Sequence, residues 1–396
     1  MSAATGSPSV NTAAVAAMRA GRTAEARWLL EEAVARDPND IMLWLNLAGA
    51  RRALGENGAA FAAVEAALRI DARSFHALLM KASLIERTGD LVQAAIGYGL
   101  ALTQAPPRDR LDAATQRAHD HAIEVYGDYT KRLRVHLADA VSGEKAAAKS
   151  EESRRIGAFI DHFAGSRRIF QQRPSTFYYP GLPSIEFYPR DLFPWLDQLE
   201  AATPAIQAEL AEIFSSAESP SGFSPYVAYA DGLPLDQWAE LNHSPRWTAF
   251  HLLKDGVPVA ENWVRVPATG AAIRRAPTPD VQGRSPAAMF SVLQPKTRIP
   301  PHNGVSNTRL VVHLPLVIPP GCGFRVGNET RKWRIGEAWV FDDTIEHEAW
   351  NESGDARTIL IFDIWSPFLS PNERELIQRV TRAADAFNGN LPGGDL

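Results

Sequence analysis

Two histidines near the end of the chain have the type and setting to build a metal site. His302 lies in IPPHNGVSN just ahead of an apolar run, and His347 lies in FDDTIEHEAWN just after another. Residues at strand ends meet at the mouth of a β-barrel, so two imidazoles can share one metal ion. Imidazole binds iron(II), copper, nickel and zinc, which leaves the metal open at this point. Taken singly, each histidine is more often a hydrogen-bonded structural residue.

An arginine that follows the second histidine narrows the range of reactions that the site could catalyse. Arg357 stands at the start of the apolar run TILIFDIW. A guanidinium fixed inside a barrel binds a carboxylate with two parallel hydrogen bonds. A small dicarboxylate held by Arg357 could reach the metal with a keto-acid end, which is the chemistry of 2-oxoglutarate oxygenases. The alternative is a surface ion pair of Arg357 with Asp355 or Glu352.

Short apolar runs separated by Gly, Pro and Asn turns predict the strands that position these side chains. Several runs are apolar on both faces, which is typical of strands buried in a sandwich or barrel. Alternation along TRLVVHLPLVIP places Arg309, Val311 and His313 on one face, and a partly polar lining suits a ligand cavity. We expect a jelly-roll (double-stranded β-helix) domain. The runs are AMFSVLQP, TRLVVHLPLVIP, GFRVG, EAWVFDD and ARTILIFDIW.

The N-terminal part of the chain carries an internal repeat of 34 residues. A period of this length with small residues in phase is typical of tetratricopeptide-like helix pairs, in which Ala lets helices approach closely and Gly ends a helix. An Ala-rich bundle without a shared period is the alternative. Such repeats present a concave face to a peptide or protein, or serve only as a packing module. The columns are Gly21, Gly55 and Gly89; Ala26, Ala60 and Ala94; Ala33, Ala67 and Ala101; and Ala14, Ala48 and Ala82.

These patterns predict a multidomain α + β chain in three parts. We expect a helical repeat domain over residues 11–140 and a helical linker over 141–174, which includes the charged stretch SGEKAAAKSEES. The jelly-roll domain follows over 175–385, where Pro and aromatic residues become frequent.

Composition excludes several classes of protein. The chain has 396 residues, 45% of them hydrophobic and 22% charged, with a net charge of −5 and no long basic block. A general nucleic-acid binder is therefore not expected. Cys322 is the only cysteine, so neither an intrachain disulfide nor a Cys-rich zinc site can form. No apolar run reaches the roughly 18 residues of a membrane span, and no signal peptide is recognisable. We expect a cytoplasmic protein with no membrane partner, and the sequence indicates no oligomeric state.

The stretch from Ser291 to Pro367 resembles the catalytic core of the aspartyl/asparaginyl β-hydroxylase family. The run PHNGVSNTRLVVHLPL resembles the family's first metal-ligand motif, and GEAWVFDDTIEHEAWN the segment that leads to its second. The upstream YYPGLPSIEFYPRDLFPWLDQLE is similar to the segment ahead of that core, so the resemblance covers about residues 175–367. Some members also carry helical repeats ahead of this domain.

The resemblance implies that His302 and His347 bind Fe(II). The family lacks the carboxylate of the usual facial triad. This sequence agrees, because Gly304 stands two residues after His302. Adjacent Asp342 and Asp343 cannot both point inward from one strand. One of them could be a third metal ligand. We favour a structural role, in which one orients the His347 ring by a hydrogen bond.

The resemblance also implies a 2-oxoglutarate site. Arg357 and Ser291 would hold the distal carboxylate, and His313 would orient the carboxylate near the metal. Family members with activity often have Arg where this chain has Val311. Arg309, two residues earlier on the same strand face, would compensate by contributing to cosubstrate binding.

The expected activity is Fe(II)/2-oxoglutarate-dependent hydroxylation of a C–H bond. The family implies the β-carbon of an Asp or Asn residue in a peptide or protein, which the repeats could help to bind. Two alternatives stay open. Gly304 could leave room for a halide, and the same chemistry would then halogenate. A chain that fails to bind iron(II) would instead be a non-catalytic repeat and β-barrel module for peptides.

Overall fold

The computed structural model describes residues 10–143, 150–215, 222–281 and 283–388. Contacts divide the chain into two compact units, residues 1–166 and 167–396, called here the helical unit and the β unit. The boundary falls inside the expected linker, because helix α9 (Ser150–Phe163) belongs to the helical unit. Part of the charged stretch, 144–149, lies outside the described residues.

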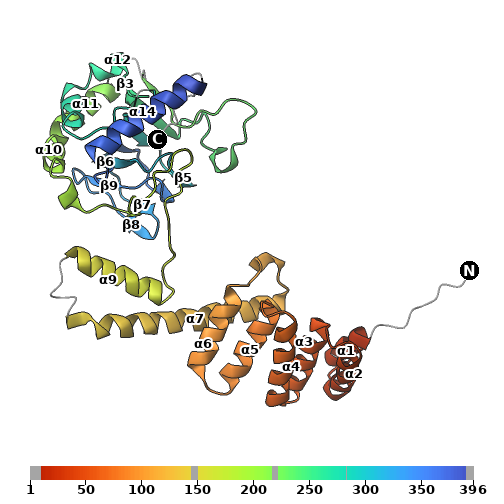
Figure 1. Cartoon of the computed structure of the whole chain (residues 1–396). Helices are drawn as coiled ribbons and strands as arrows, with labels where there is room; N and C mark the ends of the chain where they lie inside the picture. Colours follow the sequence, from red (N-terminus) through yellow and green to blue (C-terminus); the bar gives the residue numbers. More distant parts are fainter. Residues whose placement is uncertain (1–9, 144–149, 216–221, 282, 389–396) are drawn as a thin grey trace, which may run out of the picture. The chain divides into compact units, whose positions relative to one another are not determined.

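The helical unit consists of helix pairs that follow the 34-residue period (Figure 1, red to yellow). Gly21, Gly55 and Gly89 have φ of +75°, +80° and +88°, which only glycine adopts without strain, and each ends a helix within a pair. The predicted repeat architecture is confirmed. The helices are α1 (Val10–Arg19), α2 (Thr23–Arg36), α3 (Ile41–Ala53), α4 (Asn57–Ile70), α5 (Phe75–Arg87), α6 (Leu91–Leu102) and α7 (Ala113–Ala140), with a 3₁₀ turn η1 (Arg108–Arg110).

Small residues form the contacts between these helices. Ala14, Ala48 and Ala82, one column of the repeat, are fully buried. A Cβ added at Gly97 of α6 would lie 3.1 Å from the Cβ of Ala82 of α5, so these helices already touch at the backbone level. Close packing of this kind leaves no room for larger side chains.

The β unit contains two antiparallel sheets (Figure 1). The larger sheet has the strand order β1-β2-β4-β11-β6-β9, with β3 paired to β2, and the smaller sheet has the order β5-β10-β7-β8. The strands are β1 (Phe223–Pro225), β2 (Trp247–Lys254), β3 (Val257–Pro258), β4 (Ala288–Leu293), β5 (Thr297–His302), β6 (Arg309–Val317), β7 (Cys322–Val326), β8 (Glu329–Arg331), β9 (Trp339–Phe341), β10 (His347–Asn351) and β11 (Arg357–Trp365).

Two apolar clusters show how the layers stack. One holds side chains of both sheets, such as Val311 and Ile359 with Phe324 and Ala349, and so lies between them. The other joins the opposite face of the larger sheet to helices, among them α10 (Leu196–Ala201), α11 (Thr203–Ser215) and α13 (Pro267–Ile273). The larger sheet is therefore buried on both faces, and the predicted β-sandwich of jelly-roll type is confirmed. The remaining elements are η2 (Arg190–Leu192), η3 (Asp236–Trp238), α12 (Ala260–Trp263) and α14 (Pro371–Asn388).

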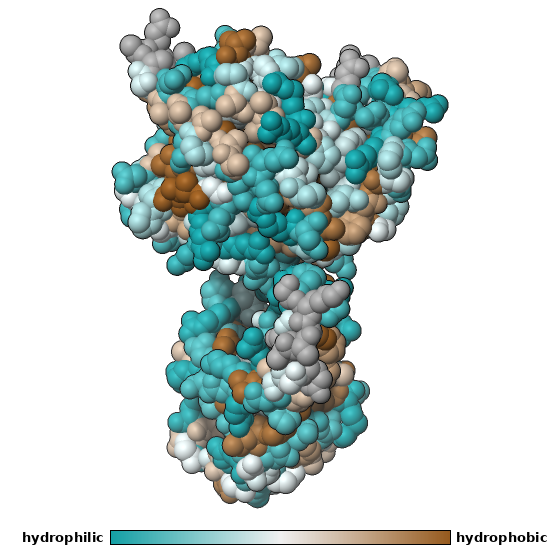
Figure 2. Space-filling view, turned by 90° about the vertical axis from the view of Figure 1, so that its left-hand side faces the viewer, coloured by the Kyte–Doolittle hydropathy of each residue, from teal (hydrophilic) through white to brown (hydrophobic). Residues whose placement is uncertain are grey.

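Surface properties agree with the composition. Hydrophilic residues cover most of the face seen in Figure 2, and hydrophobic residues gather in separate patches. Within the described ranges, no helix has the length and apolar character needed to cross a membrane.

Candidate active site

A cavity of about 60 Å³ lies between the two sheets of the β unit, and we call it the His cavity. Both sheets contribute polar side chains to an otherwise apolar lining, in which Val311 and Phe324 are typical residues. The structure thus brings together predicted site residues that lie up to 66 positions apart in the sequence (357 − 291). The predicted site residues in its lining are Ser291, His302, His313, His347 and Arg357.

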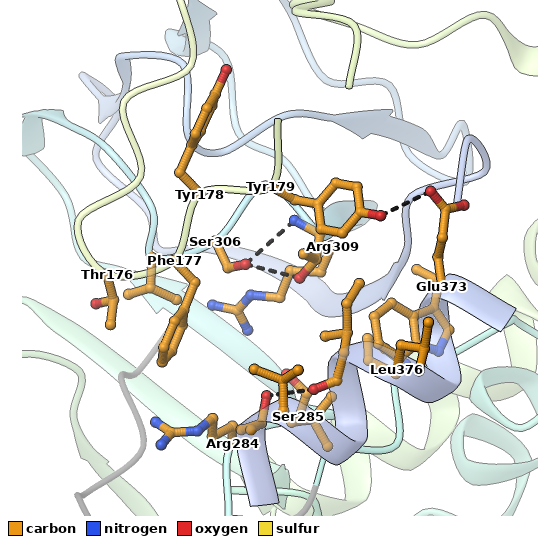
Figure 3. A pocket seen from close by; sticks show the side chains of 18 residues that line it. Thr176, Phe177, Tyr178, Tyr179, Arg284, Ser285, Ser306, Arg309, Glu373 and Leu376 are labelled. Carbon is orange, nitrogen blue, oxygen red and sulfur yellow. Dashed lines mark hydrogen bonds between the residues drawn. The ribbon is translucent and has the colours of Figure 1, made fainter. Parts of the chain in front are cut away.

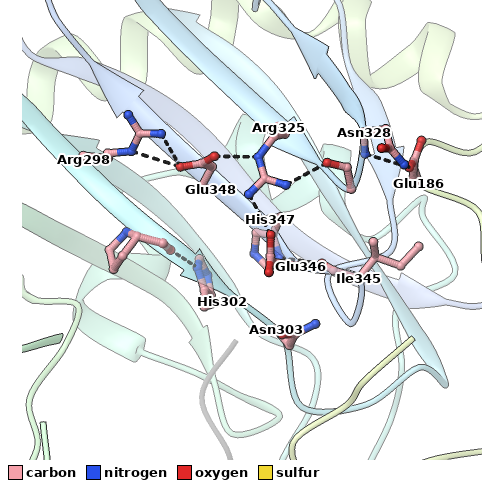
Figure 4. Close-up of polar contacts among 12 residues, drawn as sticks. Glu186, Arg298, His302, Asn303, Arg325, Asn328, Ile345, Glu346, His347 and Glu348 are labelled. Carbon is pink, nitrogen blue, oxygen red and sulfur yellow. Dashed lines mark hydrogen bonds and ion pairs between the residues drawn. The ribbon is translucent and has the colours of Figure 1, made fainter. Parts of the chain in front are cut away.

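The two histidines face each other across neighbouring strands. His302, the last residue of β5, is the register partner of His347, the first residue of β10, and their ring centroids are 4.0 Å apart. Nδ1 of His302 lies 2.8 Å from the carbonyl oxygen of Pro300, and Nδ1 of His347 lies 3.1 Å from that of Ile345 (Figure 4). A carbonyl oxygen only accepts, so each Nδ1 carries a proton and each Nε2 keeps a lone pair for a metal.

Burial keeps both rings neutral, the form that binds metals. It lowers the pKa of His302 to about 4 and holds the pKa of His347 well below its usual value, with a further contribution from His302. Desolvation disfavours the imidazolium in each case. Both rings are therefore ready to act as ligands near neutral pH.

The expectation that an aspartate side chain orients His347 was wrong. The ring donates instead to the main-chain carbonyl of Ile345. Asp342 accepts from the side chain of Gln172 at 2.6 Å and from the hydroxyl of Thr344 at 2.6 Å. Asp342 thus stabilises the turn ahead of β10, and the local main chain fixes the histidine.

Asp343 covers the glycine at the position of the usual facial-triad carboxylate. A Cβ on Gly304 would lie only 2.0 Å from Oδ2 of Asp343, so the carboxyl group fills the space of a side chain. Oδ1 is buried without a hydrogen-bond partner, and burial raises the pKa of Asp343 to about 7, although the charge of Arg309 opposes that shift. In the described part of the chain, no group of three or more His, Cys, Asp and Glu residues is placed to hold a metal. His302 and His347, whose ring centroids lie 4.0 Å apart in the lining of the His cavity, are the pair that could hold a metal ion there.

Arg357 presents a buried cation to the same cavity. Its side chain is 1% exposed, its Cζ lies 4.9 Å from the Trp333 ring centroid, and Nε and Nη1 have no hydrogen-bond partner. No ion pair to Arg357 is found among the described residues, so the alternative of a surface pair with Asp355 or Glu352 was wrong. Burial lowers the pKa of Arg357 to about 10, still well above neutral pH. An uncompensated buried charge is costly, and a bound carboxylate would offset that cost.

Ser291 and His313 complete the polar side of the cavity. Oγ of Ser291 accepts from Nε1 of Trp247 at 3.1 Å, so its own hydroxyl proton remains free to be donated. Nδ1 of His313 is buried without a partner, and its ring packs on those of Phe324 and Phe341. Together with Arg357, these groups form a donor set that suits carboxylate oxygens.

Arg309 is the one predicted site residue that the structure does not bring into the His cavity. Its Nη1 donates to Oδ2 of Asp363 at 2.9 Å, and its side chain lines a second cavity. Asp363 of β11 is the register partner of Val311 of β6. Leu310, the residue next to Arg309, belongs to the adjacent pair of this ladder. The Asp363 carboxylate therefore holds the Arg309 guanidinium away from Val311. Of these two residues of β6, Val311 lines the His cavity and Arg309 does not.

Aromatic residues beside the His cavity were missed at the sequence level. The ring of Trp238 lies edge-on to His302 at 5.0 Å, and Tyr226 stacks on Trp247 at 3.9 Å. Tyr226 and Trp247 belong to the cavity lining. Their spacing follows no motif, so only the three-dimensional arrangement reveals them.

An ion-pair network holds the histidine strands in register. Glu348 of β10 accepts from Nε of Arg298 of β5 at 3.0 Å and from Nε of Arg325 of β7 at 2.6 Å. Arg325 also donates to Glu346 at 2.8 Å (Figure 4). One carboxylate thus links three strands, and networks of this kind contribute more than isolated surface pairs.

Comparisons with known proteins give matches for both units of the chain. Residues 200–367 match the family model of aspartyl/asparaginyl beta-hydroxylase, and residues 10–50 match that of a tetratricopeptide repeat. The chain is 33% identical over 196 residues to the ornithine lipid ester-linked acyl 2-hydroxylase of Rhizobium tropici, covering 49% of this chain and 65% of that protein. It is 35% identical over 153 residues to the aspartyl/asparaginyl beta-hydroxylase of Homo sapiens, covering 38% of this chain and 20% of that protein.

The chain thus spans less than two thirds of the length of either relative. Among solved structures, the TPR2B domain of yeast Sti1 in a complex with pHsp70 is 18% identical, with a TM-score of 0.26 over 29% of this chain and 90% of that one. The two family models thus match successive parts of the chain, a tetratricopeptide repeat over residues 10–50 and aspartyl/asparaginyl beta-hydroxylase over residues 200–367.

Proposed function

We propose that this protein is an Fe(II)- and 2-oxoglutarate-dependent hydroxylase. The family and both relatives support hydroxylation as the reaction. The observation that carries the cofactor assignment is Arg357, a buried guanidinium without a counter-ion in the same small cavity as two imidazoles. A ligand that offers a carboxylate to the arginine and a chelating group to a metal satisfies both features.

The residues of the cavity fit this pair of groups. Nε2 of His302 and Nε2 of His347 would hold the iron. Arg357 and the hydroxyl of Ser291 would hold the distal carboxylate of 2-oxoglutarate, and His313 would bond the carboxylate near the metal. Iron with 2-oxoglutarate supplies the oxidising chemistry, in which a C–H bond, dioxygen and 2-oxoglutarate give an alcohol, succinate and carbon dioxide.

The protein's own contribution is orientation and exclusion of water. The rings of Phe324 and Phe341 pack on His313 and lie in the cavity wall, so little water has access to the polar groups. In such a setting each charge-assisted hydrogen bond is stronger than in water. A bound carboxylate is thereby fixed in one orientation.

Two targets are consistent with the relatives. The β-carbon of an Asp or Asn residue is the target that the family name describes, and the repeats would then help to hold the peptide or protein. An ester-linked acyl chain is the target named for the relative from Rhizobium tropici. Because the His cavity is only about 60 Å³ in volume, most of either substrate would lie outside it.

Succinate formation from 2-oxoglutarate with iron(II) and air tests the proposal. Compared with wild type, His302→Ala, His347→Ala and Arg357→Ala are expected to lose at least about 100-fold in turnover, since each removes a group that holds metal or cosubstrate. Arg334→Ala is the control, because Arg334 is exposed and pairs only with Glu337.

Two other outcomes would redirect the assignment. Absence of iron(II) binding in an anaerobic titration would favour the non-catalytic module for peptides. A chlorinated product that depends on chloride would favour halogenation. Wild-type affinity of Arg357→Ala for 2-oxoglutarate would contradict the cosubstrate site itself.

A further inference from the structure

A second and larger cavity lies in the β unit, and we call it the α14 cavity. Its volume is about 280 Å³, and it shares no lining residue with the His cavity. Its walls come from helix α14, from the segment Thr176–Tyr179, from the loop that carries Arg284, and from residues at the adjoining ends of β6 and β11 (Figure 3). The segment that starts at Gly304 separates the two, because Gly304 lines the His cavity and the next residues, Val305 and Ser306, line the other.

Most polar groups in the wall of the α14 cavity already bond one another. The hydroxyl of Tyr179 donates to Glu373 at 2.8 Å, and the hydroxyls of Ser306 and Thr308 lie 2.8 Å apart (Figure 3). Arg284 is paired with Asp385. A ligand therefore meets few free donors or acceptors along these walls.

Arg284 leaves one buried nitrogen, Nε, without a hydrogen-bond partner, whereas Arg309 leaves two. Arg309 is 3% exposed, and its side chain extends into the cavity (Figure 3); Nε and Nη2 have no hydrogen-bond partner, although Nη1 bonds Asp363. A buried donor left unsatisfied costs about 1–3 kcal/mol, which a ligand oxygen would recover. Arg309 also acts on Asp343 of the His cavity, whose pKa its charge lowers against the effect of burial. Arg309 thus lines the α14 cavity, while its charge also affects a residue of the His cavity.

The mouth of the α14 cavity is apolar. Helix α14 contributes Leu376, Ile377 and Val380, with Val380 69% exposed, and Phe177 stands at the opposite wall. Exposed apolar residues that continue into a cavity are typical of a binding site. A peptide would bring an N–H and a C=O for every residue, which these paired walls cannot satisfy. A hydrocarbon chain needs no such partners.

We propose that the α14 cavity binds the acyl chain of a single-chain amphiphile, whose carboxylate or ester carbonyl accepts hydrogen bonds from Nε and Nη2 of Arg309. The chain then lies along Leu376 and Val380, and its oxygen-bearing end lies next to the His cavity. This inference rests on the proposed function only in treating the amphiphile as the substrate. Binding itself requires neither iron nor 2-oxoglutarate.

Calorimetric titration of the full chain with decanoate, without iron, tests this inference. Affinity is expected to rise about fourfold per methylene from hexanoate to decanoate, as expected for burial of a CH₂ group. Decanoate should bind at least about tenfold more tightly than decylamine, because a second cation is repelled by Arg309. Val380→Asp should weaken decanoate binding at least about tenfold through desolvation of the new carboxylate. Phe387→Asp is the matched control, since Phe387 is 91% exposed on the same helix and does not line the cavity.

Two further arms identify the head group. Arg309→Gln should abolish the preference for decanoate over decylamine, and if this variant does not fold, the Val380→Asp comparison and the chain-length series decide. Equal binding of methyl decanoate and decanoate assigns an ester-linked chain, whereas binding of decanoate alone assigns a free acid.

Three results would overturn the inference: equal affinity for hexanoate and decanoate, wild-type affinity of Val380→Asp, or tighter binding of an acetylated leucine hexapeptide at this cavity. Succinate formation is measured separately. Decanoate binding without succinate would leave the α14 cavity assigned and the hydroxylase proposal refuted, and succinate without decanoate binding would do the reverse.

Discussion

The two units of the chain differ in what they bury. In the helical unit the buried side chains are almost all apolar, and Thr130 is its one buried polar residue within the described ranges. Its buried nitrogen atoms without partners belong to Arg27 and Arg51, each of which is ion-paired through another atom. The β unit instead buries Arg357 without a counter-ion among the residues that the structure describes.

The helical unit therefore has the character of a scaffold, and the β unit that of a ligand-binding domain. The helical unit satisfies its polar groups internally and gains stability from close packing of small residues. The β unit keeps charged and polar atoms in an unfavourable environment, which is destabilising until a ligand supplies the missing partner. Residues of the β unit that destabilise the ligand-free fold are therefore the best candidates for function.

Replacement of the buried arginine tests this contrast most strongly. Arg357→Met should reduce 2-oxoglutarate affinity at least about 100-fold, yet leave the ligand-free β unit as stable as wild type or more stable by about 1–4 kcal/mol, because an uncompensated charge is removed. Thermal unfolding with and without 2-oxoglutarate measures both effects. In the helical unit, Arg51→Met removes a satisfied ion pair and should only lower stability, by up to about 1 kcal/mol. A large loss of stability in Arg357→Met would show that Arg357 is structural.

Addition of one methyl group near the histidines should have the next largest effect. In Gly304→Ala the new Cβ would lie 2.0 Å from the Asp343 carboxyl, which must move away. We expect iron(II) affinity to fall about 10–100-fold, the range typical for disturbed groups around metal ligands. Anaerobic titration measures it, with Gly354→Ala as the control because a Cβ there meets nothing within 4 Å. Unchanged affinity would mean that Asp343 has no influence on the metal.

The stability of the helical unit should depend on the volume of its buried side chains and not on buried charge. Ala82→Leu places a larger side chain where α5 and α6 already touch, and overpacking of this kind costs about 1–3 kcal/mol. Ala53→Leu, at an exposed site of α3, is the matched control. Denaturant unfolding should show the loss in the helical unit alone, with iron(II) binding by the β unit unchanged. Equal stability of both variants would contradict close packing along this column of the repeat.

The smallest expected effect is on the pH dependence of the helical unit. Glu86 accepts from Tyr98 at 2.6 Å and contacts His121 at 3.0 Å; these bonds lower the pKa of Glu86, although burial acts in the opposite direction. A carboxyl with a lowered folded pKa contributes stability above its unfolded pKa and loses it as pH falls through the folded pKa. Stability should therefore decrease below about pH 4.5, the ordinary pKa of a glutamate side chain. The decrease should be smaller in Glu86→Gln, and an identical pH profile would exclude this linkage.

The sequence predicted those features that depend on local pattern. The 34-residue columns of Gly and Ala give the repeat because each pair folds against its neighbours with the same residues. Alternation along β6 places Val311 and His313 toward the second sheet, as the structure shows. The histidine pair was predictable because its motif lies at strand ends.

Features that depend on distant partners were not predictable. The direction of Arg309 is set by Asp363, 54 residues away (363 − 309), and by no local signal. The role of Asp343 depends on how the turn before β10 folds over Gly304. The α14 cavity is assembled from segments that are distant in the sequence and share no motif, so only their packing defines it.

The pairing of His302 with His347 has a mechanical consequence. The two residues are 45 positions apart (347 − 302), yet they are direct partners in one ladder. An ion bound by both rings would cross-link two strands and close the intervening loop, much as a disulfide restricts an unfolded chain. A one-residue slip of β10 would turn His347 to the other face and open this cross-link. Metal occupancy would then report directly on whether the smaller sheet is correctly paired.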